Sequence, residues 1–102
     1  MAKYTIIIAS RVDQKLIRHI EFLARVSIKA ARNLRAEYAD VLDRLEDNPY
    51  QFPLDTDPVL RDNGYHKAIF YKRYKAVFLI EDNKVYLDAV ADCRQSSENI
   101  NI

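Results

Sequence analysis

The chain has 102 residues, of which 49% are hydrophobic and 30% are charged, and its net charge is +1. These values are typical of one small globular domain, residues 1–102, and argue against a disordered or membrane-embedded chain. A single cysteine and a single glycine argue against a disulfide framework, a thiolate metal site, a phosphate-cradling loop and a serine-hydrolase elbow, so we expect no metal and no cofactor.

The first half of the chain is predicted to form a strand and two helices. The β-branched segment 3–9 fits a strand buried on both faces or nearly so, and its apolar run is too short for a signal peptide or a membrane span, which makes the cytoplasm the expected location. Ser10 and Asp13 form a capping-box pattern that opens a helix. Two amphipathic helices, separated at Ser27 and ended by Asn48–Pro49, are predicted to pair as an antiparallel hairpin. Their apolar stripes are Val12, Leu16, Ile20 and Leu23, then Ile28, Ala31, Leu34, Tyr38, Val41 and Leu45.

The second half is predicted to be a loop followed by strands. Residues 50–63 show no periodicity, strands are expected at about 65–71, 74–81 and 84–92, and residues 96–102 are expected to fray. The order β-α-α-β-β-β predicts an α+β fold: an N-terminal strand, the helix hairpin, and a three-stranded antiparallel meander with the helices on one sheet face.

Alternation along the strands predicts which side chains lie on the uncovered sheet face. Ala89 and Ala91 are expected under the helices, and Tyr74 is expected in the core. Segment 66–75 is cationic and aromatic without a carboxylate, a composition typical of nucleic-acid contact. The residues expected on the open face include Lys67, Tyr71, Lys75, Tyr86, Asp88 and Asp92.

Four short motifs follow one another along the chain: IASR, RLEDNPYQFP, GYHKAIFYKRYKAVFLI and DAVADCRQ. Together and in this order they resemble the RelE/ParE superfamily of bacterial toxins, the toxic halves of type II toxin–antitoxin pairs, and the resemblance covers roughly residues 3–95. RelE-like members cleave mRNA on the ribosome with basic side chains of the sheet face, whereas ParE-like members poison DNA gyrase without nuclease residues. The long helix hairpin looks more like the ParE branch.

The resemblance also implies candidate site residues. By position, one family arginine falls on Lys75, a second falls on Arg94, and a family lysine falls on His66 or on the neighbouring Lys67. The tyrosine or histidine that ribonuclease members carry beyond Arg94 has no counterpart in segment 96–99.

RNA cleavage by its own 2′-hydroxyl needs a base, a charge on the phosphorane and an acid. A histidine can serve as base or acid near neutral pH, which makes His66 a candidate for either role, with Asp92 or Asp88 to orient or replace it. A purely structural His66, with Asp92 merely paired to Arg94, is the equal alternative. The candidate catalytic set is His66, Lys67, Lys75, Asp92 and Arg94, and the candidate nucleic-acid contacts are Tyr71, Lys72, Arg73 and Tyr86.

Three functions follow as expectations. The first is a ribosome-associated mRNA endoribonuclease, the second is a gyrase poison, and the third is an inactive homologue that only binds protein. In each the implied partner is a cognate antitoxin, and homodimerisation through the helix hairpin is left open. Residues 11–35 carry seven basic and two acidic side chains (+5), and residues 36–63 carry two basic and eight acidic ones (−6), so the antitoxin is expected to contribute both charges.

Overall fold

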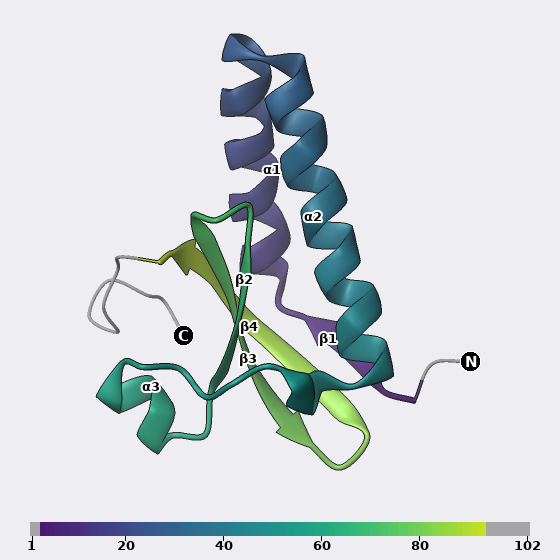
Figure 1. The fold of residues 1–102 in the computed structure, drawn as a ribbon, viewed down its shortest axis with the longest axis vertical. Coiled ribbons are helices and arrows are strands. Elements are labelled where there is room, and N and C mark those ends of the chain that lie inside the picture. The colour runs from purple at the N-terminus through teal and green to yellow at the C-terminus, as the bar shows by residue number, and fades with distance from the viewer. Residues whose placement is uncertain (1–2, 94–102) are drawn as a thin grey trace.

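The computed structural model describes residues 3–93, and its elements follow the order expected from the sequence. Strand β1 (Thr5–Ile8) leads into helices α1 (Ser10–Val26) and α2 (Ile28–Asp47), which stand as an antiparallel hairpin (Figure 1). A single 3₁₀ turn (Pro49–Gln51) and the short helix α3 (Pro58–Asp62) come next along the chain.

The remaining elements are the strands β2 (His66–Phe70), β3 (Tyr74–Glu81) and β4 (Lys84–Asp92). The sheet has the order β1-β4-β3-β2; β1 runs parallel to β4, and the meander β2-β3-β4 is antiparallel. The α+β fold is thereby confirmed. Because β1 lies at the sheet edge, with Ile7 41% exposed, the expectation of a strand buried on both faces is wrong.

The ends of the helices are set by local hydrogen bonds. Ser27 separates α1 from α2, as predicted, and its hydroxyl accepts a hydrogen bond from Ala30 N at 3.1 Å. The capping box expected at Ser10 does not form: Ala9 precedes the first helical residue, and its backbone carbonyl accepts from Val12 N at 2.9 Å. Asn48 ends α2, as predicted.

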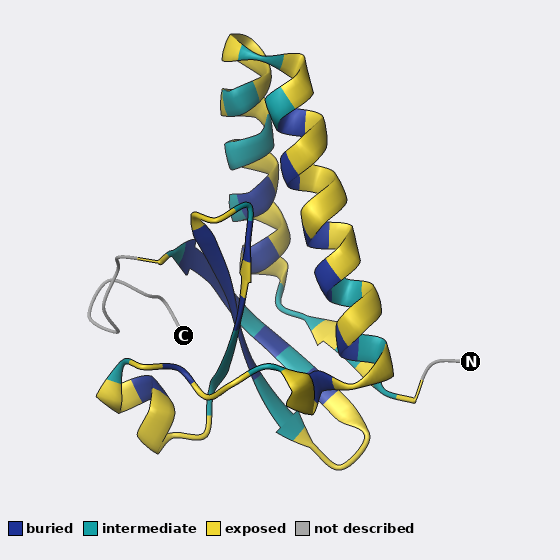
Figure 2. Ribbon diagram, viewed as in Figure 1, coloured by how far each residue is buried: buried dark blue, intermediate teal, exposed yellow. Residues whose placement is uncertain are grey.

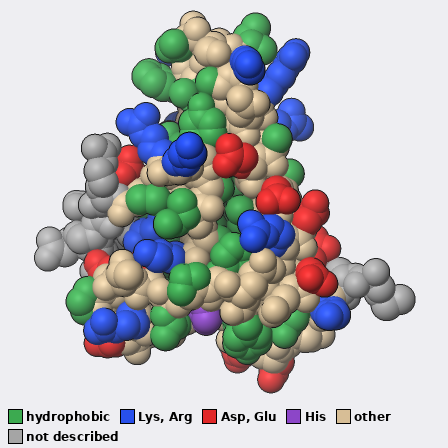
Figure 3. Space-filling model, viewed as in Figure 1, with side chains coloured by type: hydrophobic (Ala, Val, Ile, Leu, Met, Phe, Trp, Pro, Cys, Tyr) green, Lys and Arg blue, Asp and Glu red, His purple; other side chains and the backbone are tan. Residues whose placement is uncertain are grey.

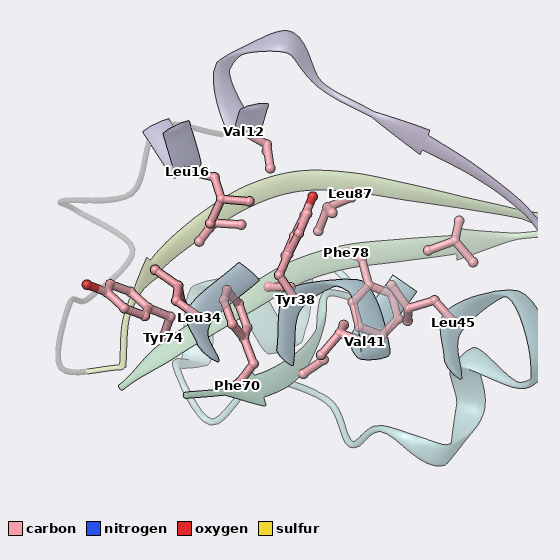
Figure 4. Packing of buried hydrophobic residues seen from close by; sticks show 14 residues of the cluster. Val12, Leu16, Leu34, Tyr38, Val41, Leu45, Phe70, Tyr74, Phe78 and Leu87 are labelled. Carbon is pink, nitrogen blue, oxygen red and sulfur yellow. The ribbon is translucent and has the colours of Figure 1, made fainter. Parts of the chain in front are cut away.

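The main hydrophobic core lies between the helix hairpin and one face of the sheet (Figures 2 and 4). The far half of the hairpin extends beyond the sheet (Figure 1), so Ile20 and Leu23 are only partly buried and Ile28 is 63% exposed, although all three belong to the predicted stripes. Tyr74 is buried, as expected. The larger core side chains are Val12, Leu16, Leu34, Tyr38, Val41, Leu45, Phe70, Tyr74, Phe78 and Leu87.

A second, smaller core covers part of the opposite sheet face. Leu60 of α3 packs there with Val77, Ala89 and Ala91, and Tyr65 lies against them. The segment that precedes β2 therefore folds over the face that the sequence predicted to be open. The prediction of an open face is wrong for the part of the sheet that α3 and its neighbouring residues cover.

A β-bulge at Asp88 changes which face the end of β4 presents. Phe78 pairs with Leu87 and Val77 pairs with Ala89, so the register skips Asp88. Beyond this point Val90 joins the main core, while Ala89 joins the smaller one. The expectation that Ala89 and Ala91 lie under the helices is wrong, because one extra residue inverts the alternation.

Candidate functional site

Lys75 lies in a buried ion pair. Its Nζ donates a hydrogen bond to Asp55 Oδ2 at 2.7 Å, and the two side chains are 5% and 0% exposed. Lys75 is on the expected sheet face, but that face is covered here. A lysine expected to meet solvent, or a ligand, instead meets a carboxylate of its own chain.

The chain holds Asp55 in place through backbone and side-chain hydrogen bonds. Asp55 N donates to the Tyr65 carbonyl at 2.9 Å, which ties the segment to the residue before β2. Its Oδ1 accepts from Asp57 N at 2.8 Å. Asp57 in turn caps α3, because its Oδ1 accepts from Val59 N at 2.9 Å. The carboxylate that neutralises Lys75 is therefore preorganised by the turn that opens α3.

Asp92 lies on the helix-facing side of the sheet, so its predicted place on the open face is wrong. It pairs in register with Tyr74, a residue of the main core, because the bulge at Asp88 has inverted the end of β4. Its Oδ2 lies 3.9 Å from Arg73 Nε. Asp92 and Lys75 are thus on opposite faces of the sheet and cannot act on one phosphate.

His66 also lies on the helix-facing side, opposite to Lys67. Its ring stacks on Phe78 with centroids 5.4 Å apart, and its Nδ1 donates to the Phe52 carbonyl at 2.9 Å. The Tyr50 ring packs against it in an edge-to-face arrangement, with centroids 6.1 Å apart. These contacts give His66 a structural part in joining β2 to the segment that follows α2.

Lys67 and Tyr86 lie on the sheet face that carries Lys75, as predicted. Lys67 is half-buried, and its Nζ lies 3.4 Å from Thr56 Oγ1. Nearby, Tyr65 Oη donates a hydrogen bond to Asp88 Oδ2 at 2.9 Å. The pKa of Tyr65 is raised to about 12, mainly by burial and secondly by this hydrogen bond. Tyr65 is a neutral hydrogen-bond donor at physiological pH, so this bond orients the Asp88 carboxylate.

Tyr71, Lys72 and Arg73 form the turn between β2 and β3. Tyr71 N donates to Glu37 Oε1 of α2 at 2.7 Å, and the Tyr71 ring stacks on Tyr74 with centroids 6.4 Å apart. Tyr71 is therefore drawn toward the main core, which corrects its predicted place on the open face.

His19 of α1 is a member of this neighbourhood that the sequence did not single out. The centroid of its ring lies 5.0 Å from that of Tyr74. The pKa of His19 is lowered mainly by burial and further by the charges of Lys15, Arg18 and Arg73, while Asp92 acts in the opposite direction. The helical spacing of Lys15, Arg18 and His19 was the available signal, but nothing local in the sequence brings β3 to them.

The candidate catalytic residues are thus divided between two faces. Lys67 and Lys75 share one face, whereas His66 and Asp92 lie on the other; Arg94 and segment 96–102 lie outside the described residues. In the view of Figure 3, Lys and Arg side chains are dispersed among hydrophobic and acidic ones. Across residues 3–93 there is no group of three or more His, Cys, Asp or Glu side chains that could hold a metal ion.

No family model and no curated protein matches this sequence. In the part of the chain that the structure describes, none of the helices has the length and apolar character needed to cross a membrane.

Proposed function

We propose that the protein is the toxin of a RelE/ParE-type toxin–antitoxin pair and that it acts by binding a protein target, DNA gyrase, in the manner of ParE-like toxins. The four sequence motifs and the β-α-α-β-β-β order support the family. The helix hairpin, which extends past the sheet as a free-standing projection (Figure 1), supports the ParE branch over the RelE branch.

The observation that carries the proposal is the buried Lys75–Asp55 pair. A ribonuclease of this family needs a cation at this position to neutralise charge on the phosphorane. The Lys75 ammonium is 2.7 Å from a carboxylate and almost fully buried, so contact with a phosphate would first require that pair to break. Breaking it would strand Asp55 without its cation, which is strongly unfavourable. The position is therefore better suited to stabilising the fold than to catalysis.

The proposed toxin acts by binding to DNA gyrase and catalyses no chemical step of its own. Its antitoxin would be a short protein encoded next to it, ordered on binding, with basic residues for segment 36–63 and acidic residues for segment 11–35. The expected location is the cytoplasm, where both antitoxin and gyrase are found.

Inducible expression in a bacterial host tests the proposal through three readouts: growth, primer extension on transcripts, and supercoiling by purified gyrase. We expect growth arrest, intact transcripts and inhibited supercoiling. The decisive variant is Lys75→Gln/Asp55→Asn, which removes both charges while leaving two amides able to hydrogen-bond. It should fold and stay toxic.

Two outcomes would overturn the proposal. Cleaved transcripts, together with a folded but non-toxic double variant, would make the protein an endoribonuclease that uses Lys75. No growth defect at all, with folded protein in the cells, would leave only a non-catalytic binding module.

A further inference from the structure

The turn between β2 and β3 is strained and cationic. Tyr71 and Lys72 both have φ of 55°, a left-handed conformation in which the Cβ atom crowds the following carbonyl. Glycine or asparagine ordinarily occupies such positions, yet here a tyrosine and a lysine do. Strained backbone of this kind is concentrated at functional sites, so the turn is a place to look for a ligand.

The surrounding structure holds the turn in this conformation. Glu37 Oε1 accepts from Tyr71 N at 2.7 Å, and the Phe70 carbonyl accepts from Arg73 N at 3.3 Å. The Arg73 carbonyl accepts from Cys93 N at 2.9 Å, which fastens the turn to the residue after β4. The side chains of Lys72 and Arg73 are consequently presented from a fixed backbone and remain exposed.

A series of rings runs from this turn to helix α1. Tyr71 stacks on Tyr74 at an interplanar angle of 20°, and Tyr74 packs against His19, whose Nδ1 lies 3.4 Å from Tyr74 Oη. Tyr74 is buried and supports the other two rings, while Tyr71 and His19 are half-buried. A half-buried ring on a rigid support is suited to stacking with a planar group.

Cations from two elements lie near His19. Lys15 and Arg18 of α1 and Arg73 of the turn all lie close enough to His19 to lower its pKa. Two carboxylates contact the turn: Glu37 Oε1 accepts from Tyr71 N, and Asp92 Oδ2 lies 3.9 Å from Arg73 Nε. Lys15, Arg18, Lys72 and Arg73 therefore outnumber these two carboxylates. We call Lys15, Arg18, His19, Tyr71, Lys72 and Arg73 the α1–turn cluster.

We propose that the α1–turn cluster binds single-stranded nucleic acid, with Lys72, Arg73 and the α1 cations on the phosphodiester backbone and one base stacked on Tyr71. Rings beside a cationic track are the combination that binds single strands with little sequence preference. An acidic peptide would use the cations but would gain nothing from Tyr71. The proposal does not depend on gyrase binding, because oligonucleotide binding to the purified chain is measured without gyrase.

Fluorescence anisotropy of the purified full chain with a short labelled oligothymidylate tests the proposal without cells or gyrase. Lys72→Ala/Arg73→Ala should weaken binding about tenfold or more and should reduce the slope of log K against log salt by about 1.4, because each lost contact to a single strand is worth about 0.7. Tyr71→Leu should weaken binding about tenfold. Tyr71→Phe, which keeps the ring, should bind like the wild type.

Lys84→Ala supplies a control that removes one exposed cation outside the cluster. Lys84 is an exposed cation at the start of β4, where the β3–β4 turn ends, and its loss should leave affinity unchanged. The proposal is overturned if the wild type shows no binding at low salt, or if Lys84→Ala weakens binding as much as the cluster variants do. It is also overturned if Tyr71→Leu binds normally and polyglutamate competes as well as unlabelled oligonucleotide, since that result would indicate an acidic protein partner.

Discussion

Neutralising one member of the Lys75–Asp55 pair should cost far more stability than neutralising both. The pair is 2.7 Å apart, and its side chains are 5% and 0% exposed, so a lone charge left behind would be desolvated without compensation. Removal of one partner of such a pair costs about 3–5 kcal/mol. Small domains are stable by about 5–15 kcal/mol, so Lys75→Gln and Asp55→Asn should each remove a large part of the total.

The double variant Lys75→Gln/Asp55→Asn should recover at least about half of that loss, because no unpaired charge is buried. Urea denaturation monitored by circular dichroism measures all four corners of the cycle, and the single variants should also melt more than about 10 °C below the wild type. Asp40→Asn is the control: Asp40 and Arg44 form a surface pair 3.7 Å apart that should contribute less than about 1 kcal/mol. If Lys75→Gln and Asp55→Asn lowered the free energy of unfolding by less than about 1 kcal/mol, as expected for the control, the reasoning would be refuted. Lys75 would then again be a candidate catalytic residue.

Three further predictions concern single side chains. Tyr38→Phe should leave stability unchanged or raise it by about 1 kcal/mol, because the buried Tyr38 Oη has no hydrogen-bond partner among the described residues. Tyr65→Phe should instead lower stability by about 1 kcal/mol, because it removes the hydrogen bond to Asp88. Urea titrations of the two variants give the comparison. Because burial and neighbouring cations lower the pKa of His19 from 6.5, its contribution to stability is complete above pH 6.5 and is lost as the pH falls below that value. The melting temperature of the wild type should therefore fall more steeply than that of His19→Gln below pH 6.5, and parallel curves would contradict this. Lys72→Gly should not lower the melting temperature, because glycine adopts φ of 55° without strain; a loss of several degrees would show that the turn is not strained.

Most of the fold could be predicted from the sequence because its local signals agree with one another. Strands β3 and β4 occupy the predicted ranges 74–81 and 84–92, and the turn between them places Asp82 at φ of 55°, which aspartate tolerates. Ser27 divides the helices as its capping preference suggests. These features depend on residues close in sequence, where periodicity and turn chemistry apply.

The candidate site was less predictable, because it depends on contacts between distant segments. Asp55 lies in a stretch without periodicity, twenty positions before Lys75, and no local pattern indicates that the two side chains meet. No sequence signal predicts the bulge at Asp88 either. The residues after it, Ala89, Val90 and Ala91, are small or apolar and fit either face of the sheet. This one skipped residue places Asp92 on the sheet face opposite to the predicted one.

The bulge and the buried pair together separate the positive charge of the strands into two regions with different environments. Lys75 is fixed under the segment that carries α3, on one face of the sheet. Arg73 of the β2–β3 turn lies near Asp92 and His19, on the side of the sheet that faces the helices. Substitutions at sites that share no partners usually have additive effects. Oligonucleotide binding should therefore survive Lys75→Gln/Asp55→Asn, and the stability cycle should be the same in a Lys72→Ala/Arg73→Ala background. Coupling between the two sets would mean that the charges act as one centre after all.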